Sequence, residues 1–465
     1  MRKAILFLVS LLLIPFSTFA KTEDREAIIT KFMEKSLDQY QIPGASLAIV
    51  EKGENVYHQQ WGTLSDGSKV TADTPFLIGS LSKPITSLAI MMLVEEGKIK
   101  LDEPIQTYLP SFTYQTDSLK PITVFHLLEQ TSGISQFDGL QVTDKEWAIE
   151  GAIHQAVEEL SGVMLSHEPG EVYEYNSANY LLLGAIIEKV SEQSFADFVN
   201  TNIFIPLGME HSAADYDRAV EKGYVPGFES WFGQPVASGG FYDHAGAPYG
   251  YIASSTNDLA RFLTFMLEGG DLLSEQNLAL LKTPPEEGKT YGLGWHFDKT
   301  EHFPYHGGGN SDFRAQMFLL PDENKAAVLL TNKYHIMEDA HVTYIMNGIR
   351  SIMSGEETEE LPKPSYMIQW SLLVITVLLG ILTILHFFRL RRKSRNRKGS
   401  FILGTLSLLL AVGLIPLFVK MVGTPWESIV FFAPDIAFLT YCLVGILALN
   451  GMMALWMTIL KKRAV

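Results

Sequence analysis

The sequence predicts an exported α/β or α+β domain that is followed by a group of membrane helices. Three observations predict this fold class. Segments of strand character lie near both ends of residues 21–350 with helical segments between them, which is typical of a domain whose first and last strands share one sheet. Residues 368–465 contain apolar stretches long enough to cross a bilayer. Residues 1–20 have the features of an export signal.

Residues 1–20 follow the order of a signal peptide. Arg2 and Lys3 form a basic start, an apolar stretch covers residues 4–15, and residues 18–20 resemble a cleavage site for signal peptidase. An uncleaved anchor helix is the alternative. Because the apolar stretch is short for a membrane span, cleavage is the favoured interpretation.

The exported region divides into elements by its apolar periodicity and its turn residues. An amphipathic helix is expected over residues 25–40, and a hairpin over residues 45–50 and 55–61. Further helices are expected over residues 82–96, 124–128, 179–190 and 256–267. Further strands are expected over residues 291–297, 314–320 and 326–332. Residues 351–367, rich in Glu and Pro at their start, form the expected linker to the membrane region.

The membrane region, residues 368–465, contains three uncharged apolar stretches, and each is long enough to span a bilayer. They cover residues 370–388, 401–419 and 436–460. Basic residues gather between the first two stretches and at the C-terminus. Since basic loops stay in the cytoplasm, residues 424–435 and the domain before the first stretch are expected outside the cell membrane. The export signal predicts the same side for that domain. A nucleic-acid patch is disfavoured for a basic segment between two spans.

Charge and cysteine usage exclude several function classes. The net charge is −16, and the basic tail hides a larger acidic excess in residues 21–367, which disfavours nucleic acid as a partner. The only cysteine, Cys442, lies in the third apolar stretch. The exported region therefore has no disulfide, no thiol nucleophile and no cysteine-based metal site.

Ser80 and Lys83 form the most informative pair in the chain. A spacing of three residues on a helix places both side chains on one face, where the amine can hold or take the hydroxyl proton. S-x-x-K also arises by chance about once or twice in a chain of this length. The plain alternative is a serine at a helix start with a solvated lysine. That alternative fits poorly with the apolar residues 76–78 just before the pair. Apolar surroundings disfavour the charged form of a lysine amine, and the neutral amine can act as a base.

Two later segments carry further candidate groups. Residues 169–180 contain Tyr175 and run into an apolar helix, a pattern that packing of tyrosines at a helix entry would also explain. His306 precedes three glycines, whose N–H groups can approach a ligand and hold a developing oxyanion. A glycine turn beside a surface histidine is the alternative for this segment.

Together these segments resemble the serine β-lactamase and penicillin-binding-protein family, in its class C β-lactamase and D-alanyl-D-alanine carboxypeptidase branch. That branch carries S-x-x-K, then Y-x-N, then K-T-G or H-x-G, in this order. The similarity covers most of residues 25–350 and leaves out the membrane tail. Further landmarks are residues 42–44, 93–99, 127–133, 206–209 and 291–295. The resemblance implies an antiparallel sheet flanked by helices, with an additional all-helical domain.

The resemblance also implies roles for individual residues. Ser80 would be the acylated nucleophile, which Lys83 activates. Tyr175 would be the general acid and base for the leaving group and for water. His306 would stand at the place of the family's lysine, in the proton network or at a substrate carboxylate. The N–H groups of Ser80 and Gly309 would form the oxyanion hole, beside Gly308.

One position departs from the family pattern. Ser177 occupies the place of the asparagine that contacts the acyl amide of the substrate, and a serine is shorter. Asn176 or Asn179 would compensate in one version of this alignment. A second register, in which Ser177 and Asn179 form the S-x-N of other branches, is also open.

These features predict a membrane-anchored serine hydrolase that acts through a Ser80 acyl-enzyme on amides or esters. D-amino-acid peptides of the cell wall or β-lactam-like compounds are the expected substrates. The alternatives are an esterase or D-amino-acid amidase, and a non-catalytic sensor of wall fragments. The expected partners are a small-molecule or peptide substrate and the lipid bilayer, with no nucleic acid. No metal or organic cofactor is expected.

Overall fold

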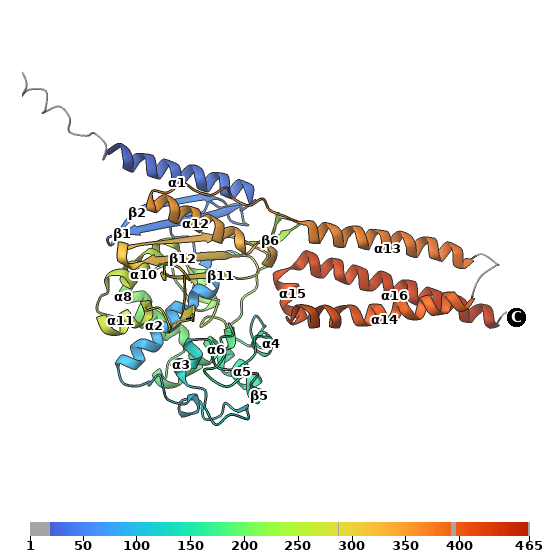
Figure 1. The fold of residues 1–465 in the computed structure, drawn as a ribbon, viewed down its shortest axis with the longest axis horizontal. Helices are drawn as coiled ribbons and strands as arrows, with labels where there is room; N and C mark the ends of the chain where they lie inside the picture. The colour runs from blue at the N-terminus through green and yellow to red at the C-terminus, as the bar shows by residue number, and fades with distance from the viewer. Residues whose placement is uncertain (1–18, 287, 392–396, 464–465) are drawn as a thin grey trace, which may run out of the picture.

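A seven-stranded antiparallel sheet forms the centre of the region that precedes the C-terminal apolar helices (Figure 1). The computed structural model describes residues 19–286, 288–391 and 397–463. The strand order is β2-β1-β13-β12-β11-β10-β9. The bounds are β1 Gly44–Glu51, β2 Glu54–Gly62, β9 Tyr291–Gly292, β10 Trp295–Phe297, β11 Pro304–Gly309, β12 Arg314–Leu320 and β13 Lys325–Thr331. Because β1 pairs with β13, the structure confirms that strands from both ends of the region share one sheet.

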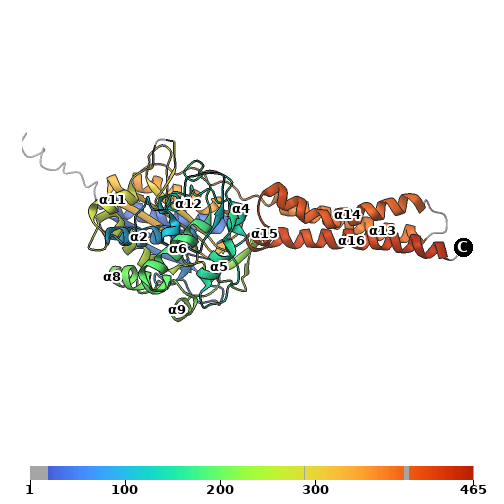
Figure 2. The same cartoon turned by 90° about the horizontal axis from the view of Figure 1, so that it is seen from below.

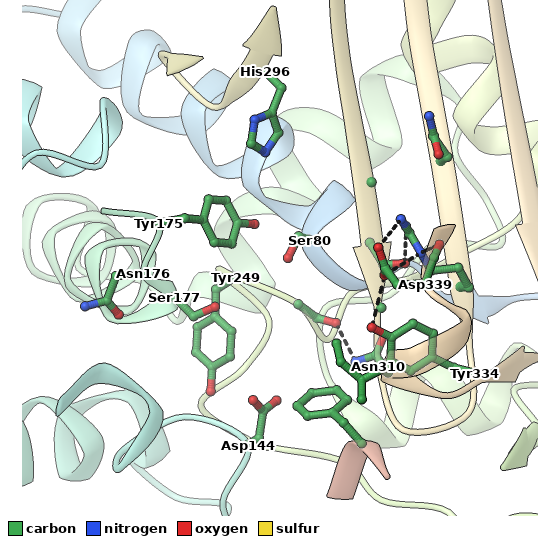
Figure 3. A pocket seen from close by; sticks show the side chains of 18 of the residues that line it. Ser80, Asp144, Tyr175, Asn176, Ser177, Tyr249, His296, Asn310, Tyr334 and Asp339 are labelled. Atoms are coloured by element: carbon green, nitrogen blue, oxygen red, sulfur yellow. Dashed lines mark hydrogen bonds and ion pairs between the residues drawn. The ribbon is translucent and has the colours of Figure 1, made fainter. Parts of the chain in front are cut away.

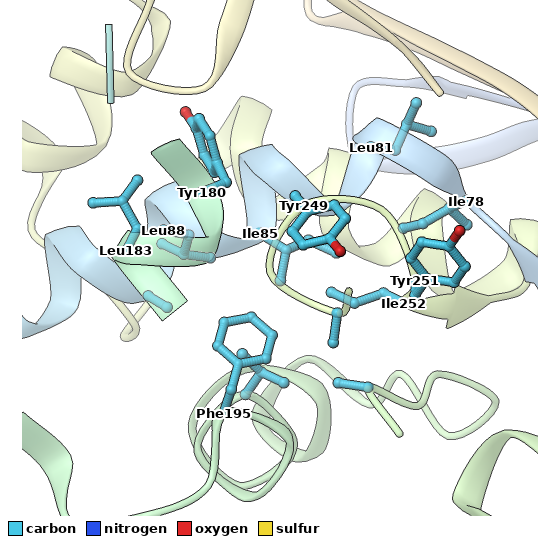
Figure 4. Close-up of a cluster of buried hydrophobic side chains, with 14 of the residues drawn as sticks. Ile78, Leu81, Ile85, Leu88, Tyr180, Leu183, Phe195, Tyr249, Tyr251 and Ile252 are labelled. Atoms are coloured by element: carbon cyan, nitrogen blue, oxygen red, sulfur yellow. The ribbon is translucent and has the colours of Figure 1, made fainter. Parts of the chain in front are cut away.

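Helices cover both faces of this sheet (Figure 1). On one face lie α1, Phe19–Gln39, and α12, Ala340–Ser354; on the other lie α2, Ser82–Glu95, and α10, Thr256–Glu268. All residues of β12 are buried, as a strand covered on both faces requires. The larger core continues from the sheet into the space between α2 and α6, Ser177–Ser191, where Leu88, Tyr180 and Phe195 lie (Figure 4).

A mostly helical region follows α2 and forms one wall of the active-site cleft. Its helices are α3 Val124–Leu128, α4 Gln136–Leu140, α5 Ala152–Leu160, α6, α7 Phe195–Val199, α8 Ile205–Leu207 and α9 Tyr216–Glu221, and α11 Glu275–Lys282 comes later in the chain. The single-turn helices are η1 Gly79–Leu81, η2 Ile105–Thr107, η3 Asn200–Phe204, η4 Pro321–Glu323 and η5 Ile336–Glu338. The small sheets are β3 Phe76–Leu77 with β8 Ala253–Ser254, β4 Tyr114–Gln115 with β5 Val163–Met164, and β14 Lys333–Tyr334 with β6 Phe228–Trp231 and β7 Gln234–Ala237.

The structure corrects two expectations about elements. The single strand expected over residues 291–297 is a tight pair, β9 and β10, because Gly294 adopts a φ of 91° and turns the chain between them. The linker expected over residues 351–367 is partly structured and partly docked. Helix α12 continues to Ser354, Leu361 is buried in the core, and the Tyr40 hydroxyl donates a hydrogen bond to the Pro362 carbonyl.

The C-terminal region contains three helices that are long and apolar enough to cross a membrane, by length and composition. They are α13 Met367–Arg391, α14 Arg397–Val422 and α16 Pro434–Arg463, and a short helix, α15 Trp426–Phe432, joins the last two. The three helices run side by side, with α15 at the end nearest the catalytic region (Figures 1 and 2). The predicted signal peptide lies almost wholly outside the described residues, and so does much of the basic loop, residues 392–396.

Close contacts between small and polar side chains hold this helical bundle together. A methyl group at Gly451 on α16 would lie 2.8 Å from the Gly404 carbonyl oxygen on α14, so the two backbones approach closely. His386 on α13 hydrogen-bonds Asn450 on α16 at 2.6 Å, and the Asn450 amide donates to Ser407 on α14 at 3.0 Å. One polar network thus joins all three helices.

Candidate active site

Ser80 lies at the turn that opens helix α2, and Lys83 lies in the first turn of that helix. The Lys83 Nζ atom is 2.9 Å from Ser80 Oγ, as the S-x-x-K spacing predicted. Lys83 also donates a hydrogen bond to the Tyr249 carbonyl at 2.8 Å and lies 3.4 Å from Ser177 Oγ. These contacts fix the amine at the nucleophile.

Lys83 has no exposed surface. Burial lowers its pKa from 10.5 to about 7, and the carboxylate of Asp144 opposes this shift only in part. A neutral amine can donate its protons to Tyr249 and Ser177 while its lone pair accepts the Ser80 hydroxyl proton. The surroundings of Lys83 therefore suit it to act as a base near neutral pH.

Tyr175 lies across the cleft from α2, and its hydroxyl points toward Ser80 (Figure 3). The Lys83 amine lies 4.9 Å from its ring centroid. Burial raises the pKa of Tyr175, an effect that the nearby Ser80 side chain reduces only in part. The phenol therefore keeps its proton at neutral pH and can donate it.

The start of α6 places Ser177 beside the catalytic lysine. Asn176 caps this helix by accepting a hydrogen bond from the Ala178 N–H, and its amide donates to the Ile134 and Ser135 carbonyls. The buried Asn179 amide donates to Gln130 and its oxygen accepts from Ser132. Both amides are thus committed to internal hydrogen bonds. Asn176 still borders the cavity, whereas Ser177 is the hydroxyl that reaches Lys83.

Strand β11 passes directly against the turn that carries Ser80. A methyl group at Gly308 would lie 2.0 Å from the Ile78 carbonyl oxygen and 2.8 Å from the Ser80 nitrogen. Gly79 has a φ of 56°, and a methyl group there would lie 2.3 Å from the Gly309 nitrogen. Only glycine allows this approach from either side. The backbone nitrogens of Ser80 and Gly309, which are the predicted oxyanion donors, therefore lie on two adjacent segments.

His306 is almost wholly buried behind Tyr175, with their ring centroids 6.2 Å apart. Its Nδ1 donates to the Gly307 carbonyl at 2.7 Å, so Nε2 is the acceptor that faces the Tyr291 hydroxyl at 3.4 Å. Burial holds its pKa well below the ordinary value, and His306 is not among the residues that line the cavity. This placement favours a part in the proton network over charge pairing with a substrate carboxylate.

His296 is a cavity residue that the sequence analysis missed. Its ring stacks on Tyr175 with a centroid distance of 5.6 Å, and burial lowers its pKa to about 4. A neutral imidazole therefore supports the ring of Tyr175. The histidine lies in β10, within a segment for which only strand character was predicted, and no motif distinguished it.

Ser80 opens into a cavity of about 540 Å³ whose other walls were also missed. Arg314 forms an ion pair with Asp339, with 2.9 Å between Nε and Oδ1, and its guanidinium donates to the Gly308 carbonyl at 3.0 Å. The Tyr334 hydroxyl donates to the same carboxylate at 3.0 Å (Figure 3). Arg314 thus ties the glycine strand to Asp339. Arg314 and Asp339 are 25 positions apart in the sequence, so only the fold brings them together.

Asp144 lies on the opposite side of the cavity. It accepts a hydrogen bond from the Tyr251 hydroxyl at 2.7 Å, and burial raises its pKa.

In the described part of the chain, no group of three or more His, Cys, Asp or Glu side chains is arranged to hold a metal ion.

Comparison with known proteins places this geometry in a family. Protein flp of Staphylococcus aureus (strain N315) is 30% identical over 319 residues, which cover 67% of this chain and 64% of the relative, so the match spans less than two thirds of the relative's length. The structure of the octameric penicillin-binding protein homologue from Pyrococcus abyssi has 25% identity and a TM-score of 0.61, covering 72% of this chain and 78% of that one.

A third comparison shows the shared fold alone. The D-amino acid amidase from Ochrobactrum anthropi SV3 has 22% identity and a TM-score of 0.58, covering 70% of this chain and 99% of that one. The model of the family described as Beta-lactamase matches residues 26–346. This range contains Ser80, Lys83, Tyr175 and the glycine strand, and it confirms the resemblance predicted from the motifs. The protein therefore belongs to the Beta-lactamase family.

Proposed function

We propose that the protein is a serine hydrolase that forms an acyl-enzyme on Ser80. The observation that carries this proposal is the buried Lys83 amine, 2.9 Å from Ser80 Oγ and with its pKa lowered to about 7. An unactivated serine is a weak nucleophile, and an adjacent base of matched pKa removes that limit.

In acylation, Lys83 takes the hydroxyl proton as Ser80 Oγ attacks the carbonyl carbon of the substrate. The N–H groups of Ser80 and Gly309 stabilise the oxyanion, and each donor is worth about 3 kcal/mol. The bond to the amine or alcohol leaving group then breaks, and Tyr175 supplies the proton that this group needs. Lys83 returns a proton to the phenoxide. Water attacks the acyl-enzyme in the second half-reaction, which releases the acid and restores Ser80.

The proposed substrates are D-amino-acid peptides of the cell wall or β-lactam-like compounds, with the catalytic domain on the outer face of the cell membrane. The family match and the penicillin-binding relative support this class. The export signal and the three apolar helices support the location. Membrane anchoring would keep the enzyme close to the wall that it acts on.

Ester hydrolysis is the second candidate, and Ser177 favours it. The asparagine that family members place there contacts the acyl amide, and the shorter Ser177 side chain instead lies 3.4 Å from Lys83. A weaker contact between this side chain and the acyl amide reduces the preference for hydrolysing peptides over esters.

A substrate panel tests these proposals. Turnover of nitrocefin, a D-Ala-D-Ala peptide and p-nitrophenyl acetate is measured with the full chain in detergent, beside Ser80→Ala. We expect at least one substrate to turn over in the wild type and none in Ser80→Ala. Ester turnover alone would favour the esterase. Binding of a wall peptide without turnover of any substrate would contradict the hydrolase proposal and support a sensor.

A further inference from the structure

The C-terminal helical region contacts the preceding domain through a buried hydrogen-bonded pair at the start of α16. Asp435 and His335 have no exposed side-chain surface, and 2.9 Å separates Asp435 Oδ1 from His335 Nε2. The second carboxylate oxygen, Oδ2, accepts a hydrogen bond from the Phe232 N–H at 3.0 Å. Burying a carboxylate is costly unless it is paired, so this contact has a defined geometry.

Aromatic pairs also connect the two regions. Phe431 meets Phe241 of the catalytic domain with a centroid distance of 4.7 Å, and Phe232 meets Trp370 of α13 at 5.0 Å. The tail is therefore docked through several side chains, whereas a tether alone would need none of these contacts.

Helix α15 reaches the active-site cavity through Phe432. Phe432 lines the same cavity as Ser80, and its ring lies edge-on to Tyr334 with a centroid distance of 5.9 Å. Tyr334 in turn lies against the glycine strand, since a methyl group at Gly309 would lie 2.9 Å from its ring carbon Cζ. A chain of direct contacts thus leads from the membrane tail to the predicted oxyanion donor.

We propose that α15 forms the outer wall of the substrate cleft and that Phe432 determines specificity, held in place by the Asp435–His335 hydrogen bond. This inference rests on the proposed hydrolase function. An edge-on aromatic pair offers an apolar surface that suits an aromatic or branched group on the acyl side of the substrate. A small acyl group would make fewer contacts with that wall.

The test compares two p-nitrophenyl esters that share a leaving group, the acetate and the phenylacetate, on the full chain in detergent. Phe432→Ala is expected to lower kcat/KM for the phenylacetate about fivefold, through a higher KM, and to change the acetate by less than about twofold. Asp435→Ala is expected to act in the same direction, because it releases α15. Phe388→Ala on α13 is the control, since this exposed phenylalanine packs on its neighbour Phe387 and lies outside the cavity.

Phe432→Trp provides a second variant in case the alanine variant is unstable. The larger ring narrows the cleft. It is expected to alter the ratio of kcat/KM for the two esters, while Ser80 still reacts with the acetate. An unchanged ratio in both Phe432 variants would overturn the inference and leave the hydrolase proposal standing. If neither ester acylates Ser80 while nitrocefin or the D-Ala-D-Ala peptide is turned over, the inference fails alone. If none of these compounds reacts, the proposed function fails, and the inference fails with it.

Discussion

At the scale of single residues, the site depends on the burial of one amine. The sequence places Lys83 one helical turn from Ser80, and the structure removes it from water. The charged form loses its hydration and gains only partial compensation from Asp144, so its pKa falls to about 7. Tyr175 is buried in the same cleft, but burial raises the pKa of a phenol. In the proposed mechanism the two groups therefore take opposite parts, Lys83 as base and Tyr175 as acid.

The first prediction concerns pH. Below pH 7, Lys83 is protonated and cannot take the Ser80 proton, so the acylation rate should rise about tenfold per pH unit and level off above about pH 7. Stopped-flow acylation by p-nitrophenyl acetate between roughly pH 5 and pH 9 measures this. Lys83→Arg, which keeps the charge at every pH, should be inactive throughout. A flat profile in the wild type would contradict the role of Lys83.

The second prediction concerns Ser177. Replacing Ser177 with Asn restores the longer amide that other family members carry, and it should improve amide substrates relative to esters. We expect the ratio of kcat/KM for a D-Ala-D-Ala peptide to that for p-nitrophenyl acetate to rise about threefold to tenfold. Ser177→Ala is the matched control, with no side-chain donor, and should not raise the ratio. A lower ratio in Ser177→Asn would show that the serine itself serves amide hydrolysis.

Local spacing could predict only part of the site. Ser80 and Lys83 could be predicted because they are one helical turn apart. Tyr175 could be predicted because the residues around it follow a recognisable motif. Arg314, Asp339 and Phe432 carry no such signal, because they meet only when β12, the segment before α12 and α15 are assembled. The burial of His306 behind Tyr175 was equally hidden, because a histidine beside glycines gives no indication of which face of a strand it occupies.

At the scale of elements, the key contact is the one between β11 and the Ser80 turn. Gly308 has no room for a side chain, and Arg314 ties the strand's carbonyl to Asp339. The position of the predicted oxyanion donor thus depends on the packing of a whole strand.

The third prediction tests this contact. A methyl group in Gly308→Ala would lie 2.0 Å from the Ile78 carbonyl, so β11 must shift away from Ser80. Acylation should fall by about 100-fold or more, the cost of losing one oxyanion donor. In Gly307→Ala the methyl group meets only the end of the Arg314 side chain, at 2.8 Å, and a smaller loss is expected. Thermal unfolding checks that both variants are folded. Equal, small losses would show that the strand does not set the oxyanion donors.

The elements themselves were largely predictable from periodicity. The strand expected over residues 314–320 is β12, and the helix expected over residues 124–128 is α3, because apolar patterning and turn residues mark their ends. The pair β9 and β10 was missed because the two glycines of this run, Gly292 and Gly294, do not show whether the chain turns there. The docked part of the linker was missed because its polar composition hides single anchors such as Leu361.

At the scale of the whole molecule, the tail and the catalytic domain form a continuous structure. The end of α13 and the start of α14 lie at the end of the bundle far from the domain, and α15 lies at the near end (Figures 1 and 2). In the topology predicted from the basic residues, the domain lies outside. The cleft would then open beside the bilayer surface.

The fourth prediction tests this topology. Cys442 is the only cysteine, so Cys442→Ala gives a background without thiols. In that background, Thr424→Cys should react with a membrane-impermeant maleimide in intact cells, whereas Ser400→Cys should react only after the cells are permeabilised. The opposite pattern would place the catalytic domain in the cytoplasm and contradict the proposed location.

The central claim is that Ser80, activated by Lys83, carries the acyl group. The most direct measurement is peptide mapping by mass spectrometry after the full chain has reacted with a fluorescent penicillin and, separately, with a fluorophosphonate. We predict one adduct, on the peptide that contains Ser80, absent from Ser80→Ala and strongly reduced in Lys83→Ala. An adduct on another serine, or no adduct with either reagent in the folded wild-type protein, would contradict the account.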